Sequence, residues 1–565
     1  MPQADVRNWL ARASVGLPLC IVAAIAVGMI GVVIDAVHDK RAFSAFLFIR
    51  QDFAPAILIA LLARYALRPC EAYRVLAWTD ALARRPWIVP CLLVVLCWAG
   101  HRWLLQGYDL TRDEQMTAFD AAIYAHGRLF WPIGQEWRPY AQALNQFFIL
   151  PVADRQAWVS GYLPINALAH AIMGRIGLAG LVSPLFTGIG ALALWRVTVR
   201  LWPDDRQASA VAMLLYAGSS QVVVQGMTSH AMAGHLALNM LWLLFFQRGG
   251  WSHAGAILIG FLATGLHQPI FHPLFVFPIL TGLLFHRRWR IAAVYAVAYA
   301  AIGIFWFAWP NLIVDLAGGP LAGISSTGDR LGYVERITAL LRDFGPASLW
   351  LMAMNVVRFV VWQHLLFVPL VAAGATLAWR QPLVRPLVAG ILIHLILVGL
   401  LLAYQGHGWG YRYLHGVIGS CCILGGYGWR MARPLWPSAR VWNGGNSFTF
   451  AVLMPMHMTM AAWLTVPYAQ VASAIGRLPA DAVIVDDGAV AFGADLVVNR
   501  PDLSNRPIRL LASELDTAQA AALCRHRRIL LVDATALSPI GRAINAEPSG
   551  AAHMRALRAA CPPGH

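Results

Sequence analysis

Long apolar stretches separated by short basic clusters fill this chain from its N-terminus to about residue 466. A membrane-spanning helix needs about 20 predominantly apolar residues. Three such runs, at 15–35, 53–67 and 86–106, precede the first large polar segment. Later runs lie at 161–176, 178–200, 207–225, 230–247, 254–267, 269–285, 291–309, 348–378, 386–404, 413–431 and 448–466. The pattern predicts a polytopic α-helical membrane protein with about 13–15 transmembrane helices.

The basic clusters indicate which loops face the cytoplasm, because arginine and lysine are enriched there. Such clusters occur at Arg84 and Arg85, at 286–290, and at 430–440. This assignment puts the segments 107–160, 310–347 and 467–565 outside. Two outside segments must be joined by an even number of crossings, whereas eleven runs separate 107–160 from 467–565. Either the weakest run, 161–176, is not a span, or another run is split.

Composition supports the membrane assignment. The chain is 59% hydrophobic and 12% charged, about half the charged fraction of a soluble protein. Its net charge of +16 lies in clusters between apolar runs, so we expect no nucleic-acid partner. No Asp or Glu occurs between Asp205 and Asp315, or between Asp343 and Asp481. Carboxylates are costly in hydrocarbon, so these stretches are expected to lie mostly in the membrane.

The last segment differs from the rest. Residues 482–485 and 529–532 read as strands and 514–525 as a helix, which predicts a small α/β domain over 467–565. The other predicted domains are the additional N-terminal helices, 1–85, and a catalytic membrane region, 86–466. Cys524 and Cys561 share the tail and can pair if it faces an oxidising periplasm.

The segment 107–160 carries the candidate chemistry. It opens with Asp109 and continues through Asp113 and Glu114 into a stretch with helical periodicity. A carboxylate at the membrane surface can act as a general base on a hydroxyl or amine, or it can hold a divalent cation. The alternative is purely structural, because Thr111 followed by Glu114 fits a helix-capping box.

An acidic motif in the first large outside loop, followed by many spans, resembles the GT-C glycosyltransferases. Within them the chain is most similar to the protein-mannosyltransferase and aminoarabinose-transferase-like group, glycosyltransferase family 39. The matching residues are Asp113-Glu114 and Tyr411-Arg412-Tyr413, although the proline that usually follows the second motif is replaced by Leu414. The resemblance covers roughly 86–466, so the two preceding spans are a departure from the family.

The resemblance implies transfer of a sugar from a polyprenyl-phosphate donor to an acceptor outside the membrane. Asp113 is the expected base, Glu114 its orienting neighbour and Asp109 the alternative base. Stabilising an anionic phosphate leaving group calls for arginine and polar donors. The residues expected to bind the donor phosphate are Arg412, Arg138, Arg330, Tyr413, His267 and Gln268, while Arg112 is weaker because it can neutralise Asp109 or Asp113. No cofactor is expected, since the leaving group is already a phosphate.

Histidines and tryptophans near the outside face form a second group of candidates. We expect His230, His235, Trp137 and Trp409 to line the cavity for the sugar or acceptor. A histidine inside a membrane region is more often a hydrogen-bonded core group, but several at one depth favour a polar cavity. A histidine-bound metal is the less favoured alternative.

The sequence therefore predicts a multi-pass glycosyltransferase of a bacterial inner membrane with a periplasmic C-terminal domain. Its expected partners are the lipid-linked donor, membrane lipids and an extracytoplasmic acceptor of unspecified kind. A transporter or flippase of lipid-linked sugars is an alternative, but transporters tend to show internal repeats, and none is evident. A non-catalytic envelope scaffold is the third class.

Overall fold

A computed structural model gives the fold of this chain. It describes residues 3–35, 40–68, 77–144, 147–322, 338–339, 341–342, 345–544 and 551–561. The described chain forms two compact units. The first, called the membrane unit here, comprises Met1–Gly100, Leu181–Phe305 and Val334–Met460, and the second, the loop–tail unit, comprises His101–Gly180, Trp306–Tyr333 and Ala461–His565. The predicted domains 1–85, 86–466 and 467–565 remain predictions.

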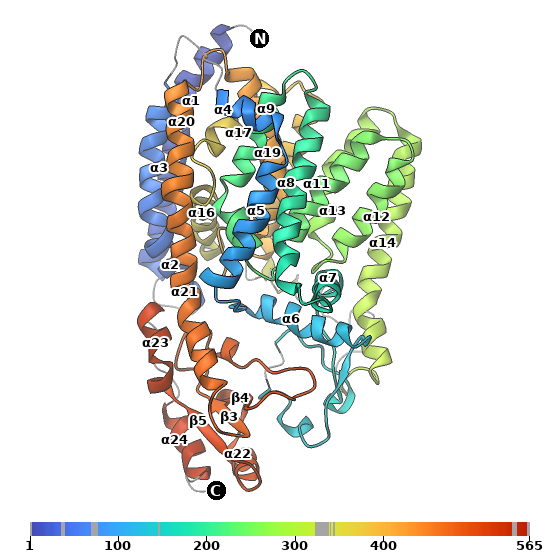
Figure 1. Cartoon of the computed structure of the whole chain (residues 1–565), viewed down its shortest axis with the longest axis vertical. Coiled ribbons are helices and arrows are strands. Elements are labelled where there is room, and N and C mark those ends of the chain that lie inside the picture. Colours follow the sequence, from blue (N-terminus) through green and yellow to red (C-terminus); the bar gives the residue numbers. More distant parts are fainter. Residues whose placement is uncertain are drawn as a thin grey trace. The chain divides into compact units, whose positions relative to one another are not determined.

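All regular secondary structure among the described residues of the membrane unit is helical (Figure 1). Its N-terminal elements are α1 (Gln3–Asp35), α2 (Lys40–Leu47), the π-helix η1 (Phe48–Asp52), α3 (Phe53–Ala66), α4 (Ala77–Arg84) and α5 (Ile88–Ala99). The central elements are α8 (Val182–Leu201), α9 (Arg206–Ala217), α10 (Ser220–Gly226), α11 (Met232–Arg248), α12 (Ser252–Thr264), α13 (Phe271–Phe285) and α14 (Trp289–Leu316). The last are α16 (Pro346–Val361), α17 (Phe367–Leu377), α18 (Val384–Leu401), the 3-10 helix η6 (Arg412–Val417), α19 (Ile418–Ala432), α20 (Ala439–Phe448), the π-helix η7 (Thr449–Leu453) and α21 (Met454–Ile475).

Close helix packing in this unit depends on small residues. Helices α17 and α19 contact each other along their length. A Cβ at Gly374 would collide with the carbonyl oxygen of Leu424, and one at Gly428 with that of Leu370. Small residues allow helix backbones to approach closely where lipid leaves little hydrophobic driving force between helices. The glycines of α17 and α19 thus set the spacing of this pair.

The polytopic helical architecture is confirmed. Within the described residues, six helices are long and apolar enough to cross a membrane, or eight if each of two bent helix pairs is one span. Five further apolar helices have 10–17 residues. The weakest predicted run, 161–176, forms the 10-residue helix α7 (Ile165–Gly174), about 15 Å long against a hydrocarbon core of about 30 Å. Without it, ten of the eleven runs remain, the even number that the predicted sidedness requires; the exact number of crossings stays a prediction.

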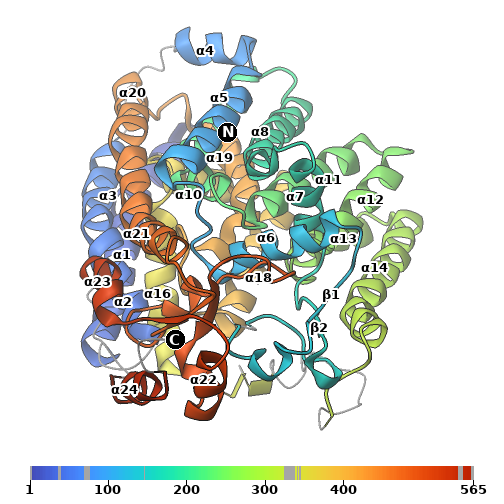
Figure 2. The same ribbon diagram turned by 60° about the horizontal axis from the view of Figure 1, so that its bottom comes forward.

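The loop–tail unit combines the acidic segment with the α/β tail. Its first part contains η2 (Gly100–Leu104), α6 (Arg112–Ala125), β1 (Trp131–Pro132), η3 (Arg138–Tyr140), η4 (Ala153–Arg155), β2 (Ala157–Trp158), α7 and η5 (Ala179–Leu181). Helix α6 packs against α7, and β1 pairs with β2 in antiparallel register (Figure 2).

The tail is the predicted α/β structure. It contains β3 (Ala482–Val485), η8 (Gly493–Leu496), β4 (Ile508–Leu511), η9 (Ala512–Glu514), α22 (Thr517–Cys524), β5 (Ile529–Val532), α23 (Ala534–Ile544) and α24 (Ala551–Ala560). The three strands form a parallel sheet in the order β4-β3-β5. Both predicted strands are confirmed, whereas β4 was not predicted. Cys524 and Cys561 form a disulfide, as the alternative of an oxidised tail predicts.

One apolar core joins the two parts of this unit. Trp137, Leu144 and Trp158 from the loop are buried together with Ile484 and Leu510 from the sheet. The backbone N–H of Leu511 also donates to the carbonyl of Ala143, over 2.7 Å. Because these contacts are buried, they fix the acidic loop on the tail.

Candidate functional site

The N-terminus of α6 holds the predicted acidic motif by a capping box. The Thr111 hydroxyl accepts from the Glu114 N–H at 3.3 Å, and the Glu114 carboxylate accepts from the Thr111 N–H at 2.9 Å. Glu114 is buried. Burial, with the nearby charge of Asp109, raises the pKa of Glu114 to about 8. The structural alternative for Glu114 is therefore confirmed, because its carboxylate completes the helix cap.

Asp113 lies on the same turn but has a different environment. Its side chain is half-buried, and one carboxylate oxygen accepts a hydrogen bond from the hydroxyl of Tyr162. The ring of Tyr162 stacks on Phe148, with 5.0 Å between ring centres. Tyr162 thus orients the Asp113 carboxylate and stabilises its charged form. The sequence analysis missed Tyr162, because 49 residues separate it from Asp113 and no local pattern links the two.

Asp109 lines a cavity of about 590 Å³ within the loop–tail unit. The polar residues around this cavity include Gln115, Asn499, Asn505, Arg500 and Arg509. The Gln115 amide donates to the backbone carbonyls of Asp109 at 3.0 Å and Asp495 at 2.8 Å. The cavity is large enough for a small ligand, since typical ligand pockets measure about 300–1,000 Å³.

Arg112 pairs with an acid of the tail. Its Nε lies 3.7 Å from an Asp495 carboxylate oxygen, and Nη2 donates to the carbonyl of Ala494 at 2.8 Å. Burial raises the pKa of Asp495 to about 7 and lowers the pKa of Arg112, and their mutual attraction offsets part of both shifts. Arg112 therefore anchors α6 to η8, while its charge also interacts with that of Asp113.

The remaining candidates of the loop–tail unit have structural contacts. Trp137 is buried in the apolar core, and the guanidinium of Arg527 lies 4.3 Å from its ring centre. Arg138 is half-buried and donates from Nε to the carbonyl of Ile133 at 3.2 Å. Arg330 lies outside the described residues. Trp137 thus contributes to packing in this structure, while its predicted contact with a sugar stays a prediction.

In the membrane unit, Arg412 is buried among neutral polar groups. Its Nη1 donates to Nε2 of His230 at 3.3 Å, and Nη2 donates to the Tyr413 hydroxyl at 3.4 Å. Because arginine can only donate, Nε2 of His230 accepts, so the ring proton resides on Nδ1 and donates to Gln225 at 3.1 Å. The structure thus brings together Arg412, Tyr413 and His230, three of the predicted site residues.

Three glutamines hold the irregular segment that precedes Arg412. Gln221 donates to the carbonyl of Tyr411 at 3.0 Å, and Gln225 to that of Trp409 at 3.3 Å. Gln405 donates to the carbonyl of Gly410 at 2.9 Å and accepts from the Arg412 N–H at 3.0 Å. Non-helical backbone within a membrane region requires such internal partners. The sequence analysis did not single out these glutamines, although amides inside apolar runs were a usable signal.

A glycine allows this segment to pass close to α10. Gly410 has φ of +62°, a conformation that favours glycine, and a Cβ there would collide with the side-chain oxygen of Gln221. Trp409 is 1% exposed and lies against Trp362, with 6.4 Å between ring centres. Within the described residues, its indole N–H has no hydrogen-bond partner.

A histidine group lies near the start of η6. His272 donates from Nδ1 to Asn239 at 2.7 Å and accepts at Nε2 from the Tyr299 hydroxyl at 2.7 Å. The Asn239 amide donates to the carbonyl of Gly416 at 3.1 Å. His235 is 2% exposed, and neither ring nitrogen has a partner within the described residues. His272 is a hydrogen-bonded core group, whereas His235 offers polar atoms that a bound ligand or water can satisfy.

The predicted pair His267 and Gln268 lies in the turn between α12 and α13, where both are half-buried. No three His, Cys, Asp or Glu side chains of the described chain are arranged to hold a metal ion.

A buried ion pair, missed by the sequence analysis, connects the N-terminal helices to the Arg412 segment. Arg358 Nε lies 3.8 Å from an Asp52 oxygen, and Nη2 donates to Gln51 and to the carbonyl of Gly408, both at 2.9 Å. The Trp362 indole donates to Asp52 at 3.1 Å. The available sequence signal was the presence of Asp52 and Arg358 in or beside apolar runs, because charged residues are rare in membrane segments and often functional.

Comparisons with known proteins give only distant similarities. No family model matches the chain, and no curated protein matches it. Among solved structures, ArnT from Cupriavidus metallidurans bound to undecaprenyl phosphate is 12% identical, covering 73% of this chain and 84% of that one, with a TM-score of 0.45. The apo form of the same protein is 13% identical over 80% of this chain and 90% of that one, with a TM-score of 0.41.

The archaeal oligosaccharyltransferase AglB from Archaeoglobus fulgidus, in complex with an inhibitory peptide and a dolichol-phosphate, is 12% identical. It covers 81% of this chain and 68% of that one, with a TM-score of 0.36. All three solved structures share no more than 13% of their residues with this chain. At TM-scores below 0.5 they carry no argument about chemistry, which has to come from the residues described above.

Proposed function

We propose that this protein is a membrane glycosyltransferase that takes a sugar from a polyprenyl-phosphate donor and passes it to an extracytoplasmic acceptor. The observation that carries the proposal is the environment of Arg412, a buried guanidinium that contacts a neutral histidine and a tyrosine hydroxyl. These two contacts hold the Arg412 guanidinium in a fixed position inside the membrane unit. An arginine in a desolvated polar site suits a phosphate leaving group.

The loop–tail unit supplies carboxylates for the acceptor. Asp113 is oriented by Tyr162 and half-exposed, while Glu114 is buried in the helix cap. We therefore assign the general base to Asp113 and keep Asp109, which lines the polar cavity, as the alternative base. Glu114 supports Asp113 by fixing the first turn of α6.

In the proposed reaction, Asp113 removes the proton from an acceptor hydroxyl or amine. The deprotonated acceptor atom attacks the anomeric carbon, the bond from that carbon to the phosphate oxygen breaks, and polyprenyl phosphate leaves with the electron pair. A single displacement of this kind inverts the anomeric centre. Arg412, with Tyr413 and His230, stabilises the negative charge on the departing phosphate. The reaction is balanced without a metal or another cofactor.

We further propose that the tail faces the periplasm of a bacterial inner membrane. The disulfide between Cys524 and Cys561 supports this, because disulfides persist in oxidising compartments. A cysteine placed at exposed Arg500 should react with an impermeant thiol reagent from the periplasmic side of intact cells. Reaction from the cytoplasmic side alone would reverse the topology.

The function itself is tested in proteoliposomes that contain the purified chain and a polyprenyl-phosphate sugar with a radiolabelled sugar. Release of polyprenyl phosphate together with label in an acceptor fraction is the expected result, and a chelator should leave it unchanged. Movement of intact labelled lipid between leaflets, without cleavage, would identify a flippase instead. Neither activity would favour the scaffold function.

A further inference from the structure

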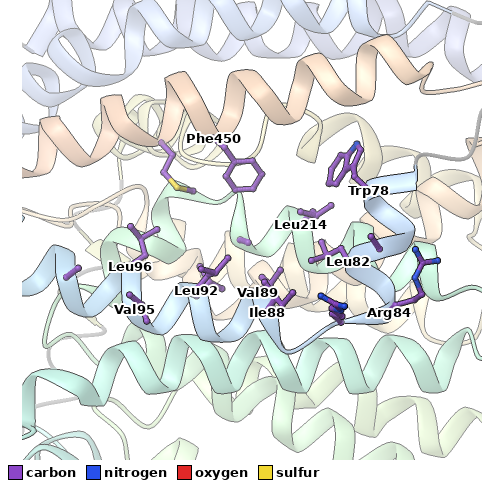
Figure 3. Close-up of a pocket in the computed structure, with 16 residues that line it drawn as sticks. Trp78, Leu82, Arg84, Ile88, Val89, Leu92, Val95, Leu96, Leu214 and Phe450 are labelled. Atoms are coloured by element: carbon purple, nitrogen blue, oxygen red, sulfur yellow. The ribbon is translucent and has the colours of Figure 1, made fainter.

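An apolar groove of about 1150 Å³ runs along the outer side of α5 in the membrane unit (Figure 3). Its lining includes Ile88, Leu92, Val95 and Leu96 from α5, which face Phe450 of η7 across the gap. Leu92 and Val95 are 62% and 60% exposed, so the described protein leaves this apolar surface uncovered. The volume is slightly above the roughly 300–1,000 Å³ of typical small-molecule pockets.

Two arginines stand at one end of this groove. Arg84 closes the row of apolar side chains in Figure 3, and Arg85 also contributes to the lining. Both are exposed, and neither makes an ion pair within the described residues. The charge at this end is therefore available to an anionic group, and arginine binds phosphate well because its planar fork can donate two parallel hydrogen bonds.

The arginine end has the features of a lipid-headgroup level. Helix α4 turns by 91° relative to the helix that begins at Ile88, so α4 runs across the direction of α5. Trp78 on α4 and Trp87 just after it are 40% and 60% exposed. Tryptophan and arginine are enriched where a membrane helix meets the headgroup region. The apolar part of the groove then extends from this level toward the bilayer interior.

The wall at this end is held in place by polar contacts. The Trp78 indole donates to Asn443 of α20 at 2.9 Å, and its ring stacks on Trp442 with 6.1 Å between centres. Asp80 of the same helix accepts from Gln207 of α9 at 3.0 Å. Helix α4 is thus tied to both neighbouring helices, and the arginines are presented from a fixed support.

The groove length fits the tail of one leaflet. Helix α5 has 12 residues, about 18 Å of helix, and residues along its whole length line the groove. Half of a hydrocarbon core of about 30 Å is about 15 Å. A ligand with an anionic head at Arg84 and Arg85 and an acyl tail along Leu92 and Val95 matches both the charge and the length.

We propose that this groove binds one anionic glycerophospholipid, with its phosphate at Arg84 and Arg85 and an acyl chain along α5. The proposal is independent of the transferase function, because none of its residues belongs to the proposed catalytic or donor-binding groups. A lipid seated here adds apolar contacts between α5 and η7, which only partly cover each other in the protein alone.

The test uses the full-length protein in lipid nanodiscs that contain equal amounts of phosphatidylglycerol and phosphatidylcholine. Lipids retained after transfer to a mild detergent are counted by native mass spectrometry. Wild-type protein should retain one phosphatidylglycerol in preference to phosphatidylcholine. Each arginine near an anionic headgroup contributes roughly a factor of five in binding, so the double variant Arg84→Ala, Arg85→Ala should retain about 25-fold less.

A matched control removes two exposed arginines elsewhere in the same unit. The double variant Arg287→Ala, Arg288→Ala has the same net charge as the test variant and should retain the lipid as wild type does. Leu92→Trp fills the groove while keeping both arginines, and it should also lose the lipid. If size-exclusion elution shows that the Arg84→Ala, Arg85→Ala variant does not fold, lipid retention by Leu92→Trp tests the proposal alone.

Three outcomes would overturn the proposal. The first is equal lipid retention by the Arg84→Ala, Arg85→Ala double variant and the control double variant. The others are equal retention of the two lipids by wild type, and unchanged retention by Leu92→Trp. A fourth is displacement of phosphatidylglycerol by equimolar undecaprenyl phosphate, which would assign the groove to the polyprenyl lipid. The first three results leave the transferase proposal untouched, whereas the fourth concerns where a polyprenyl lipid binds; sugar transfer itself is measured separately.

Discussion

The acidic turn of α6 and the arginine segment of the membrane unit show two ways of holding a charge. At α6 the acids are close in sequence, and Thr111 caps the turn within three residues of Glu114. Around Arg412 the partners come from distant helices, with His230 separated by 182 residues. The first arrangement is set by local backbone chemistry, whereas the second depends on the packing of the whole helical unit. A short sequence motif can therefore reveal a site like the acidic turn of α6, but not one like the surroundings of Arg412.

The largest effect on sugar transfer is expected at Asp113, whose carboxylate is oriented by Tyr162 and only half-buried. Asp113→Asn should reduce the transfer rate by about 10²- to 10⁴-fold, the usual contribution of a general base. Asp109→Asn is the matched comparison, with a smaller loss if Asp109 only lines the acceptor cavity. Glu136→Gln, an exposed acid in the same loop, is the control. Initial rates with the labelled donor measure all three, and a larger loss in Asp109→Asn would exchange the two assignments.

Much of the architecture follows from the sequence because its causes are local. Apolar runs predict the helices, alternating β-formers predict β3 and β5, and Thr111 with Glu114 predicts the cap. Strand β4 (Ile508–Leu511) was missed because Arg509 interrupts its apolar residues, whereas β3 and β5 are apolar throughout. The resemblance drew attention to Arg412, but no spacing rule connects it to Gln225 or Gln405. Those contacts exist only after the helices have packed.

The buried pair of Arg358 and Asp52 tests the dependence on long-range packing. Asp52→Asn should lower stability by about 3–5 kcal/mol, because it leaves a buried guanidinium without its anionic partner. The double variant Asp52→Asn, Arg358→Met should be less destabilised than the sum of the single variants. Thermal unfolding in detergent measures the stability of each variant. The control is Arg385→Ala at an exposed position, whose stability should stay within about 0.5 kcal/mol of wild type. Strict additivity would show that the two groups do not interact.

The disulfide between Cys524 and Cys561 is expected to stabilise the tail and, through it, the loop–tail unit. Cys524→Ser with Cys561→Ser should lower the stability of the loop–tail unit by about 2–4 kcal/mol. Protease sensitivity of 467–565 should rise in this variant, and adding a reductant to wild type should have the same effect. Cys91→Ser, at an exposed free cysteine of α5, is the control. Identical protease sensitivity of all three proteins would contradict a structural role for the bond.

The smallest effect on sugar transfer is expected at Glu114, the buried acid of the capping box. Glu114→Gln keeps both hydrogen bonds of the capping box, so transfer should stay within about twofold of wild type. Folding raises the pKa of Glu114 from 4.5 to about 8, so the folded form binds the proton more tightly than the unfolded form. Its contribution to stability is therefore full below pH 4.5 and is lost as pH rises toward 8. Glu114→Gln should flatten this part of the stability profile, and an unchanged profile would contradict the buried neutral acid.

Binding of polyprenyl phosphate to two variants, Arg412→Ala and Asp113→Asn, tests the division of roles most directly. Arg412→Ala should weaken binding by at least about tenfold, since it removes a charge-assisted contact with the phosphate. Asp113→Asn should bind the lipid phosphate as wild type does, although it transfers sugar about 10²- to 10⁴-fold more slowly, because Asp113 acts on the acceptor. Titration calorimetry of the full chain in detergent supplies both affinities. Equal affinity of Arg412→Ala and wild type, or a loss confined to Asp113→Asn, would contradict the assignment of the arginine to the donor and of the carboxylate to the acceptor.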